Sequence, residues 1–198
     1  MQADFAVELG PDDETLEFPW SDEASGLRYF DLKRHPELLS EIDEAEAFAE
    51  LAEFLSAMNG PSGALETVKC DAWQTGEMNV EDEIFGATCK FGSYVDLVFA
   101  DDSARFSFAS IEGFAGRLVT LLKKVPEIPA SAEFLIRRCY FRNEEQMRDG
   151  FYMTFYLFGY GEDEPQCRQR WGIALTLVQN AILQLSRRDS AGAGAQRP

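Results

Sequence analysis

The strongest constraint on the fold is that the last two-thirds of the chain contains the same pattern twice. Between residues 65 and 125, two β-type runs precede a long amphipathic helix, and the same order returns between residues 131 and 186. The first run of each half carries a mid-strand cysteine close to an aromatic residue, at Cys70 and at Cys139. A repeat of this length indicates a repeated structural unit, and it predicts two pseudo-repeated ββα units that share one antiparallel sheet.

The length of 198 residues suits one α+β domain, which we expect to span residues 1–186. Residues 1–60 are predicted to supply an acidic arm and an N-terminal helix, and residues 61–186 the repeated core. The remaining residues, 187–198, are rich in alanine and glycine and are predicted to form a disordered tail.

Local signals place the smaller elements. Leu16, Phe18 and Trp20 alternate with Glu17 and Pro19, which predicts that part of the arm is an edge strand. The stretch from Glu46 to Met58 has a helical apolar stripe, and Asn59-Gly60-Pro61 ends it.

Further signals lie between the repeated elements. A short third strand is expected over Arg105–Phe108, with Ser110 as the cap of the next helix. Gly159-Tyr160-Gly161 is interpreted as a turn before the last helix. Asp163 or Glu164 is expected to cap that helix. The carboxylates at this helix N-terminus would repel a phosphate, so the segment is not interpreted as a nucleotide-binding loop.

Charge is the second constraint. The formal net charge is −17, of which residues 1–60 contribute −13, since they hold 16 acidic and three basic side chains. Such a surface repels phosphate backbones and anionic lipid, so nucleic acid and membranes are not expected as partners. A protein partner fits the charge, for instance a basic protein, and Asp12, Asp13, Glu14 and Glu17 are the carboxylates we expect to select it. Solubility alone is the competing explanation for this charge.

The N-terminal residues lack a basic segment followed by an apolar one, and no run of 18 apolar residues occurs. Four widely spaced cysteines (Cys70, Cys89, Cys139 and Cys167) form no CxxC motif. These features favour a cytoplasmic protein whose cysteines are reduced and structural.

The sequence contains few candidates for catalytic residues. His35 is the only histidine and precedes Pro36 in a polar stretch, so a capping or surface role is favoured over a place in a catalytic triad. Zinc ligands at workable spacing are missing, and the consecutive Glu81-Asp82-Glu83 lack the alternation of a calcium loop. No metal, no cofactor and no catalytic residue are predicted, which favours a protein that is not an enzyme.

The second face of the predicted sheet is the candidate binding surface. Alternate residues of a strand share a face, and this face is expected to gather amphipathic aromatics, arginines and aspartates, which are typical of binding surfaces. The candidate residues are Asp71, Trp73, Tyr94, Asp96, Arg138, Tyr140, Arg142, Tyr152 and Tyr156. Two other interpretations stay open: the helix over residues 46–58 packs on these tyrosines, or Asp71 and Asp96 approach each other as an acid–base pair.

The element order is helix, two or three strands, helix, two strands, helix. In this order and in its acidic charge, the chain resembles the bacterial secretion chaperones. The resemblance implies a cytoplasmic homodimer.

Two functions follow as expectations. The first is a non-catalytic protein that mediates protein–protein interaction, chaperone-like or regulatory. The second is a small-ligand-binding domain or an enzyme that uses a polar–aromatic pocket beneath Trp73, Tyr94 and Tyr152. A pocket closed by the arm and lined by Asp71, Asp96 and Arg138 would favour the second function, and a flat or helix-covered face would favour the first.

Overall fold

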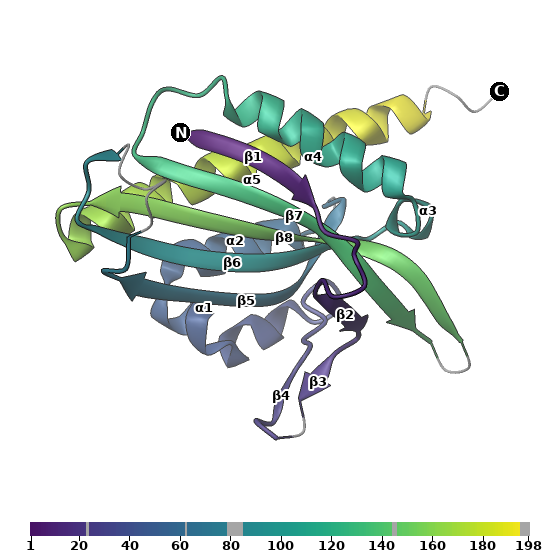
Figure 1. Ribbon diagram of the computed structural model, residues 1–198. Coiled ribbons are helices and arrows are strands. Elements are labelled where there is room, and N and C mark those ends of the chain that lie inside the picture. Colours follow the sequence, from purple (N-terminus) through teal and green to yellow (C-terminus); the bar gives the residue numbers. More distant parts are fainter. Residues whose placement is uncertain (23, 62, 79–84, 144–145, 195–198) are drawn as a thin grey trace.

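A six-stranded sheet forms the middle layer of the computed structural model, with helices on one face (Figure 1). Much of the segment between the first strand and the first helix, residues 8–35, which we call the arm, lies on the other face. The structure describes residues 1–22, 24–61, 63–78, 85–143 and 146–194, and side chains as far as Arg188. The α+β class expected from the sequence is confirmed. In the described part of the chain, no helix combines the length and apolar character needed to cross a membrane.

The sheet has the order β1-β7-β8-β6-β5, and β2 also pairs with β7, beyond the end of β1. The bounds of the strands in the sheet are β1 Gln2–Val7, β2 Thr15–Phe18, β5 Leu65–Thr75, β6 Cys89–Phe99, β7 Ala130–Arg142 and β8 Met147–Gly161. The four long strands are antiparallel, whereas β1 and β2 both run parallel to β7. The expected edge strand around Leu16 is therefore confirmed, but the sheet is mixed rather than wholly antiparallel.

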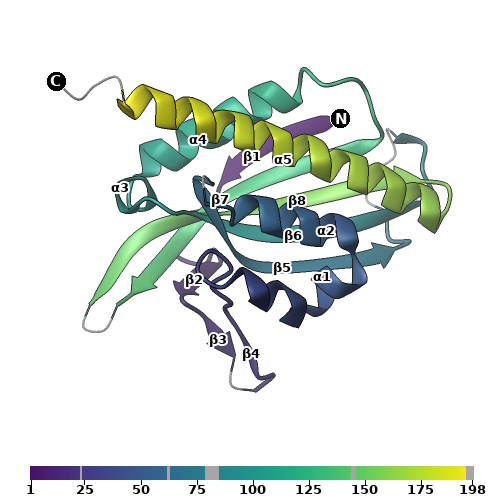
Figure 2. The ribbon, with the colours of Figure 1, turned by 180° about the vertical axis from the view of Figure 1, so that it is seen from behind.

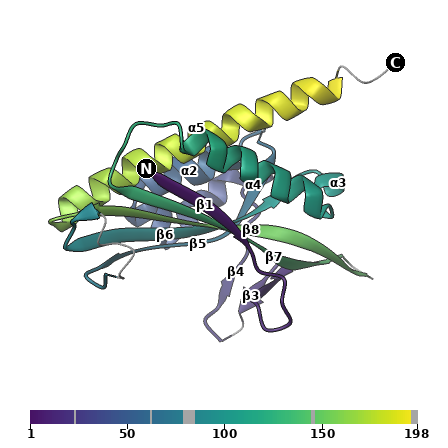
Figure 3. The ribbon, with the colours of Figure 1, turned by 45° about the horizontal axis from the view of Figure 1, so that its top comes forward.

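The arm continues from β2 into a small two-stranded sheet, β3 (Ser21–Asp22) and β4 (Leu27–Arg28). This hairpin projects on the side of the main sheet opposite to the helices, as the tilted view in Figure 3 shows.

The helices gather on the other face, where Figure 2 shows α2, α4 and α5 lying across the strands. The helix bounds are η1 (a 3-10 helix) Pro36–Glu41, α1 Asp43–Ala47, α2 Ala49–Met58, α3 Asp102–Arg105, α4 Phe108–Leu122 and α5 Glu164–Gly194. We call the apolar interior beneath them the helix-side core. Its largest fully buried side chains include Phe54, Phe114, Phe134, Phe155 and Trp171.

Side-chain caps explain where three helices begin. The Asp101 carboxylate accepts from the Ala104 amide at 3.0 Å, and the Ser107 hydroxyl accepts from the Ser110 amide at 3.3 Å. The strand expected over residues 105–108 is therefore wrong, because these caps start α3 and α4 there, and Ser107 rather than Ser110 is the cap. The predicted cap of α5 is confirmed, since Asp163 accepts from the Gln166 amide at 2.9 Å.

All the described helices that pack on the main sheet lie on its other face, so the second face carries no helix within the described ranges. Phe54 of α2 packs against Phe155, on the same side as α4 and α5, so the interpretation in which residues 46–58 cover the tyrosines is wrong. The arm covers part of the second face instead. The arm-side core consists of Leu16, Val68, Val98, Cys139, Phe141 and Tyr152.

The two cysteines that matched in the repeat lie on opposite faces of the sheet. Cys70 packs against the helix-side core, whereas Cys139 is fully buried in the arm-side core. All four cysteines are free thiols. The expected equivalence of Cys70 and Cys139 is therefore wrong, although the hairpins β5–β6 and β7–β8 occur in the expected order.

The last helix is longer than the sequence indicated. Helix α5 runs to Gly194, whereas residues 187–198 were expected to be disordered. Residues 195–198 lie outside the described part of the chain.

Gly159 determines how closely α5 approaches the sheet. It belongs to β8, not to a turn, and pairs with Phe91 on one side and Ala130 on the other. A Cβ at this position would overlap the backbone nitrogen of Trp171 and the backbone oxygen of Cys167. The absence of a side chain therefore lets α5 lie directly on β8.

We expect Gly159→Ala to lower the free energy of unfolding by about 3 kcal/mol, because the added methyl forces the α5 backbone away from the sheet. Urea denaturation followed by circular dichroism measures the change. Gly76→Ala is the matched control, since a Cβ there meets nothing within 4 Å, and its effect should stay within about 0.5 kcal/mol. Equal effects of the two substitutions would contradict this account.

Candidate functional site

Arg137 joins the arm to the second face of the sheet. It lies on β7, and its guanidinium donates to Glu8 Oε2 at 2.7 Å and to Glu14 Oε2 at 2.9 Å. The same group donates to the Thr154 hydroxyl at 3.2 Å, and the Arg137 side chain is only 10% exposed. Glu8 follows β1 directly and Glu14 directly precedes β2, so this one cation holds both ends of the connecting loop.

The network continues from Arg137 to a buried carboxylate. Thr154 donates its hydroxyl to Asp96 Oδ1 at 2.7 Å, and Asp96 is 4% exposed. Burial raises the pKa of Asp96 to about 6, although the Thr154 hydrogen bond and the charges of Lys69 and Arg137 lower it. Asp96 therefore changes its protonation state close to neutral pH.

We expect the stability of the protein to fall as Asp96 ionises. Its native pKa lies above the ordinary value of 3.8, so its stabilising contribution is present below that value and is lost as the pH rises through about 6. The loss amounts to about 3 kcal/mol at 1.36 kcal/mol per pKa unit. Between pH 4 and 8, wild type should therefore lose about that much stability relative to Asp96→Asn, measured by urea denaturation.

Thr154→Val gives an independent check on this assignment. The substitution removes the hydroxyl that lowers the pKa of Asp96, so the fall in stability should move to higher pH. An NMR titration of the Asp96 carboxyl follows the same change directly. Parallel stability curves for wild type and Asp96→Asn across this pH range would exclude Asp96 as the titrating group.

Aromatic side chains line the strands beside this network. Tyr94 and Tyr156 are paired in register, with ring centroids 6.0 Å apart, and Trp73 lies 6.5 Å from Tyr94 and 6.1 Å from Phe158. All four rings are half-buried. Burial, and next the charge of Asp96, raise the pKa values of Tyr94 and Tyr152, so both phenols stay neutral hydrogen-bonding groups.

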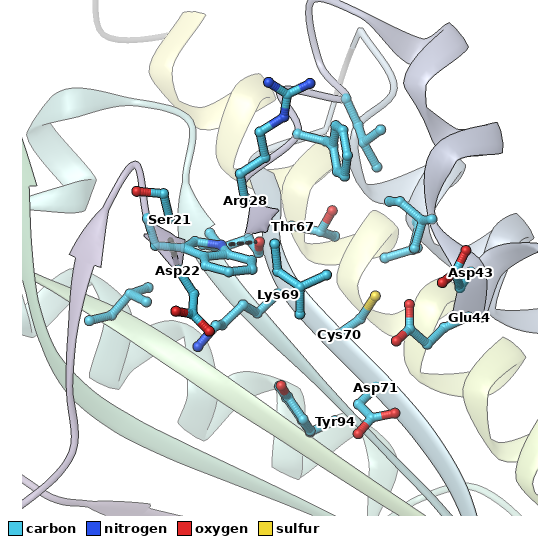
Figure 4. A pocket seen from close by; sticks show the side chains of 18 of the residues that line it. Ser21, Asp22, Arg28, Asp43, Glu44, Thr67, Lys69, Cys70, Asp71 and Tyr94 are labelled. Atoms are coloured by element: carbon cyan, nitrogen blue, oxygen red, sulfur yellow. Dashed lines mark hydrogen bonds between the residues drawn. The ribbon is translucent and has the colours of Figure 1, made fainter. Parts of the chain in front are cut away.

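A cleft of about 600 Å³ opens between the arm and β5. Figure 4 shows Asp22 of the arm on one side, Asp43 and Glu44 of α1 on the other, and Asp71 on the strand between them. Among the residues that the structure describes, six carboxylates line the cleft against two basic side chains. The carboxylates belong to Glu17, Asp22, Glu41, Asp43, Glu44 and Asp71, and the basic groups to Arg28 and Lys69.

Lys69 is engaged by its neighbours in the cleft. Its ammonium lies 4.7 Å from the centroid of the Trp20 ring, and its charge partly offsets the rise in the pKa of Asp96 that burial causes. The Trp20 indole in turn donates to the Val68 carbonyl at 2.9 Å, which fixes the arm beside β5. The cleft therefore offers surplus negative charge next to an aromatic wall.

The Cys70 thiol of the cleft is poorly suited to act as a nucleophile. Burial, followed by the charge of Glu44, raises the pKa of Cys70 to about 12, so the reactive thiolate is scarce at neutral pH. Asp71 is paired with Tyr94 and Asp96 with Lys69, and Asp71 is exposed while Asp96 is buried. These placements do not favour a carboxylate pair that shares one proton.

The structure brings together six of the nine predicted site residues. Asp71, Trp73, Tyr94, Asp96, Tyr152 and Tyr156 lie on the second face. Asp71 and Tyr94 also line the cleft, whereas Tyr152 is buried beneath the arm.

The other three predicted residues, Arg138, Tyr140 and Arg142, do not share this face. The register pairs Arg137 with Tyr152 and Arg138 with Phe151, so Arg137 joins the tyrosines and the other three alternate onto the opposite side. Arg142 instead forms an exposed ion pair with Glu17 at 2.7 Å. The missed functional residue is thus Arg137, and its only sequence signal was its place beside Arg138.

Other candidate positions add little to this site. His35 forms an exposed contact with Glu37, with 3.2 Å between Nδ1 and Oε1. Glu81, Asp82 and Glu83 lie outside the described residues. Within the described ranges, no group of three or more histidine, cysteine or acidic side chains is arranged to hold a metal ion.

Comparison with known proteins gives no relative from which a function can be transferred: no family model, no curated protein and no solved structure matches this chain.

Proposed function

We propose that this protein is a non-catalytic binding protein that holds a positively charged, extended segment of a partner protein in the cleft between the arm and β5. The observation that carries the proposal is the lining of the cleft, with six carboxylates against two cations in a volume of about 600 Å³. A volume in this range accommodates a few residues of peptide or one small ligand. Five of the six carboxylates belong to residues 1–60, the acidic third of the chain.

The half-buried aromatics supply the second element of recognition. Trp20 lines the cleft, and Tyr94 connects it to Trp73 and Tyr156 along the sheet. Aromatic rings bordered by carboxylates attract lysine and arginine side chains by charge and by cation–π contact. This surface suits alternating basic and apolar residues in an extended peptide.

The acidic residues divide into structural and recognition groups. Glu14 and Glu17 form ion pairs with Arg137 and Arg142, so reversing their charges is expected to disturb the arm as well as any partner. Asp43, Glu44 and Asp71 face the cleft and are the better residues with which to test binding.

We expect a fluorescein-labelled peptide of alternating lysine and leucine to bind the protein, and an alternating glutamate and leucine peptide not to bind. The triple variant Asp43→Asn, Glu44→Gln, Asp71→Asn should weaken binding about tenfold, because three partly exposed charge contacts contribute about 0.5 kcal/mol each. Fluorescence anisotropy measures the affinity. Raising the salt concentration from about 0.05 M to about 0.3 M should weaken the binding of the peptide further, because the Debye length falls below about 10 Å.

The matched control is Glu53→Gln, Glu112→Gln, Glu127→Gln, which changes the net charge equally at exposed positions that do not line the cleft. This variant should bind the basic peptide nearly as wild type does. Equal loss in both triple variants would show that net charge alone attracts the peptide, and the cleft proposal would then fail.

A small cationic ligand is the second candidate, favoured by the size of the cleft. A linear polyamine added to the same assay separates the two possibilities. Displacement of the peptide by micromolar polyamine, with loss of this effect in the cleft variant, would replace the protein partner by a small ligand.

The homodimer that the secretion-chaperone resemblance implies stays a prediction, and light scattering of the purified protein tests it.

We also propose that residues 65–125 and 131–186 form two repeated ββα units. The strand order supports it, because β6 and β8 lie side by side with β5 and β7 outside them, as a twofold relation of the two hairpins requires. The opposite placement of Cys70 and Cys139 limits the relation to the order of elements.

A further inference from the structure

Two thiols from different elements lie in contact at one end of the sheet. Cys89 is the first residue of β6, and Cys167 lies in the first turn of α5. Their sulfur atoms are 2.9 Å apart, although the residues are 78 positions apart in the chain. This pair takes no part in the arm cleft or in the Asp96 network.

The backbone around the pair holds both thiols in place. The Cys167 thiol donates to the Cys89 carbonyl at 3.2 Å, and the Cys89 thiol lies 3.6 Å from the Gly161 carbonyl. Gly161 is also the partner of Cys89 across the β6–β8 ladder. A Cβ at Gly161 would come within 3.1 Å of the Cys167 sulfur, so the glycine leaves room for the thiol.

We propose that Cys89 and Cys167 are an oxidation site, at which a hydroperoxide converts the two thiols into an intramolecular disulfide. The Cys89 sulfur attacks the peroxide, giving a sulfenic acid and releasing water or an alcohol. The Cys167 sulfur then displaces the sulfenic hydroxyl, and the thiol proton leaves with it as a second molecule of water. Two thiols are oxidised by two electrons, and the peroxide O–O bond is reduced.

The second step requires only a small movement of the two sulfur atoms. A disulfide bond is about 2.05 Å long, so the sulfurs need to approach by about 0.9 Å. That movement is shared between two side chains. The bond would connect the start of β6 to the start of α5.

Exposure assigns the order of the two steps. Cys89 is half-exposed and Cys167 is fully buried, so a peroxide reaches Cys89 first. Burial, and then the neighbouring Cys89, raise the pKa of Cys167 to about 12, so its thiolate is scarce and peroxide is not expected to oxidise it first.

The other two cysteines are separated from this pair and from each other. Cys70 and Cys139 lie on opposite faces of the sheet, with β6 and β8 between their strands. Burial raises the pKa of each to about 12. Oxidation should therefore consume two of the four thiols and leave two.

The test treats the full-length protein with an equimolar amount of hydrogen peroxide. We expect titratable thiols, counted after denaturation, to fall from four to two, and the intact mass to fall by two hydrogens. Dithiothreitol should reverse both changes. The oxidised protein should melt roughly 5–10 °C higher than the reduced protein, because the bond closes a long loop of the unfolded chain.

Peptide mapping without reductant assigns the bond. Trypsin releases Cys70 and Cys89 in one peptide, residues 70–90, so the mapping uses the Cys70→Ala variant, in which a cross-link from this peptide to residues 149–168 identifies Cys89 and Cys167. Cys89→Ala should abolish the cross-link and the melting shift. Cys167→Ala should leave a sulfenic acid at Cys89 that dimedone traps.

Three results would overturn the proposal: four thiols remaining after treatment, a cross-link through Cys139, or higher oxidation without a cross-link. The mapping of wild type and Cys70→Ala decides the question even if Cys167→Ala does not fold.

Discussion

The arm side of this protein depends on the pairing of one buried guanidinium. Arg137 is surrounded by the sheet and the arm, and a charge in such a place is tolerated only when its hydrogen bonds are satisfied. Glu8 and Glu14 satisfy them from the two ends of one loop, so β1 and β2 are held as two segments of a single sheet edge. Loss of either glutamate would leave part of that charge uncompensated.

The same residue lowers the cost of burying a carboxylate in the middle of the sheet, although burial still raises the pKa of Asp96. Arg137 donates to Thr154, and Thr154 donates to Asp96, so the hydroxyl passes the polarity of the arginine to the buried acid. The helix side of the sheet is filled mainly by aromatic and aliphatic side chains. The arm side thus adds an ionic network to its smaller apolar core.

The acidic first third of the chain therefore has two separate physical roles. Glu8, Glu14 and Glu17 neutralise arginines of β7 and fix the arm to the sheet. Asp43 and Glu44, which follow in the chain, instead face the open cleft. The irregularity of β5 at Val68 connects the two roles, because the carbonyl there receives the Trp20 indole and so places the arm at the rim of the cleft.

Hydrophobic periodicity in the sequence determined the four long strands, the main helices and the α+β class, because burial on one face imposes its period on the residues nearby. It also determined that Asp71, Trp73, Tyr94 and Asp96 would share a face. Only the tertiary structure decided that Arg137 rather than Arg138 joins them, because a shift of one residue in register exchanges the faces of a whole strand. The parallel pairing of β1 with β7 and the contact of Cys89 with Cys167 were likewise decided by chain segments far apart in sequence, for which a local pattern carries no signal.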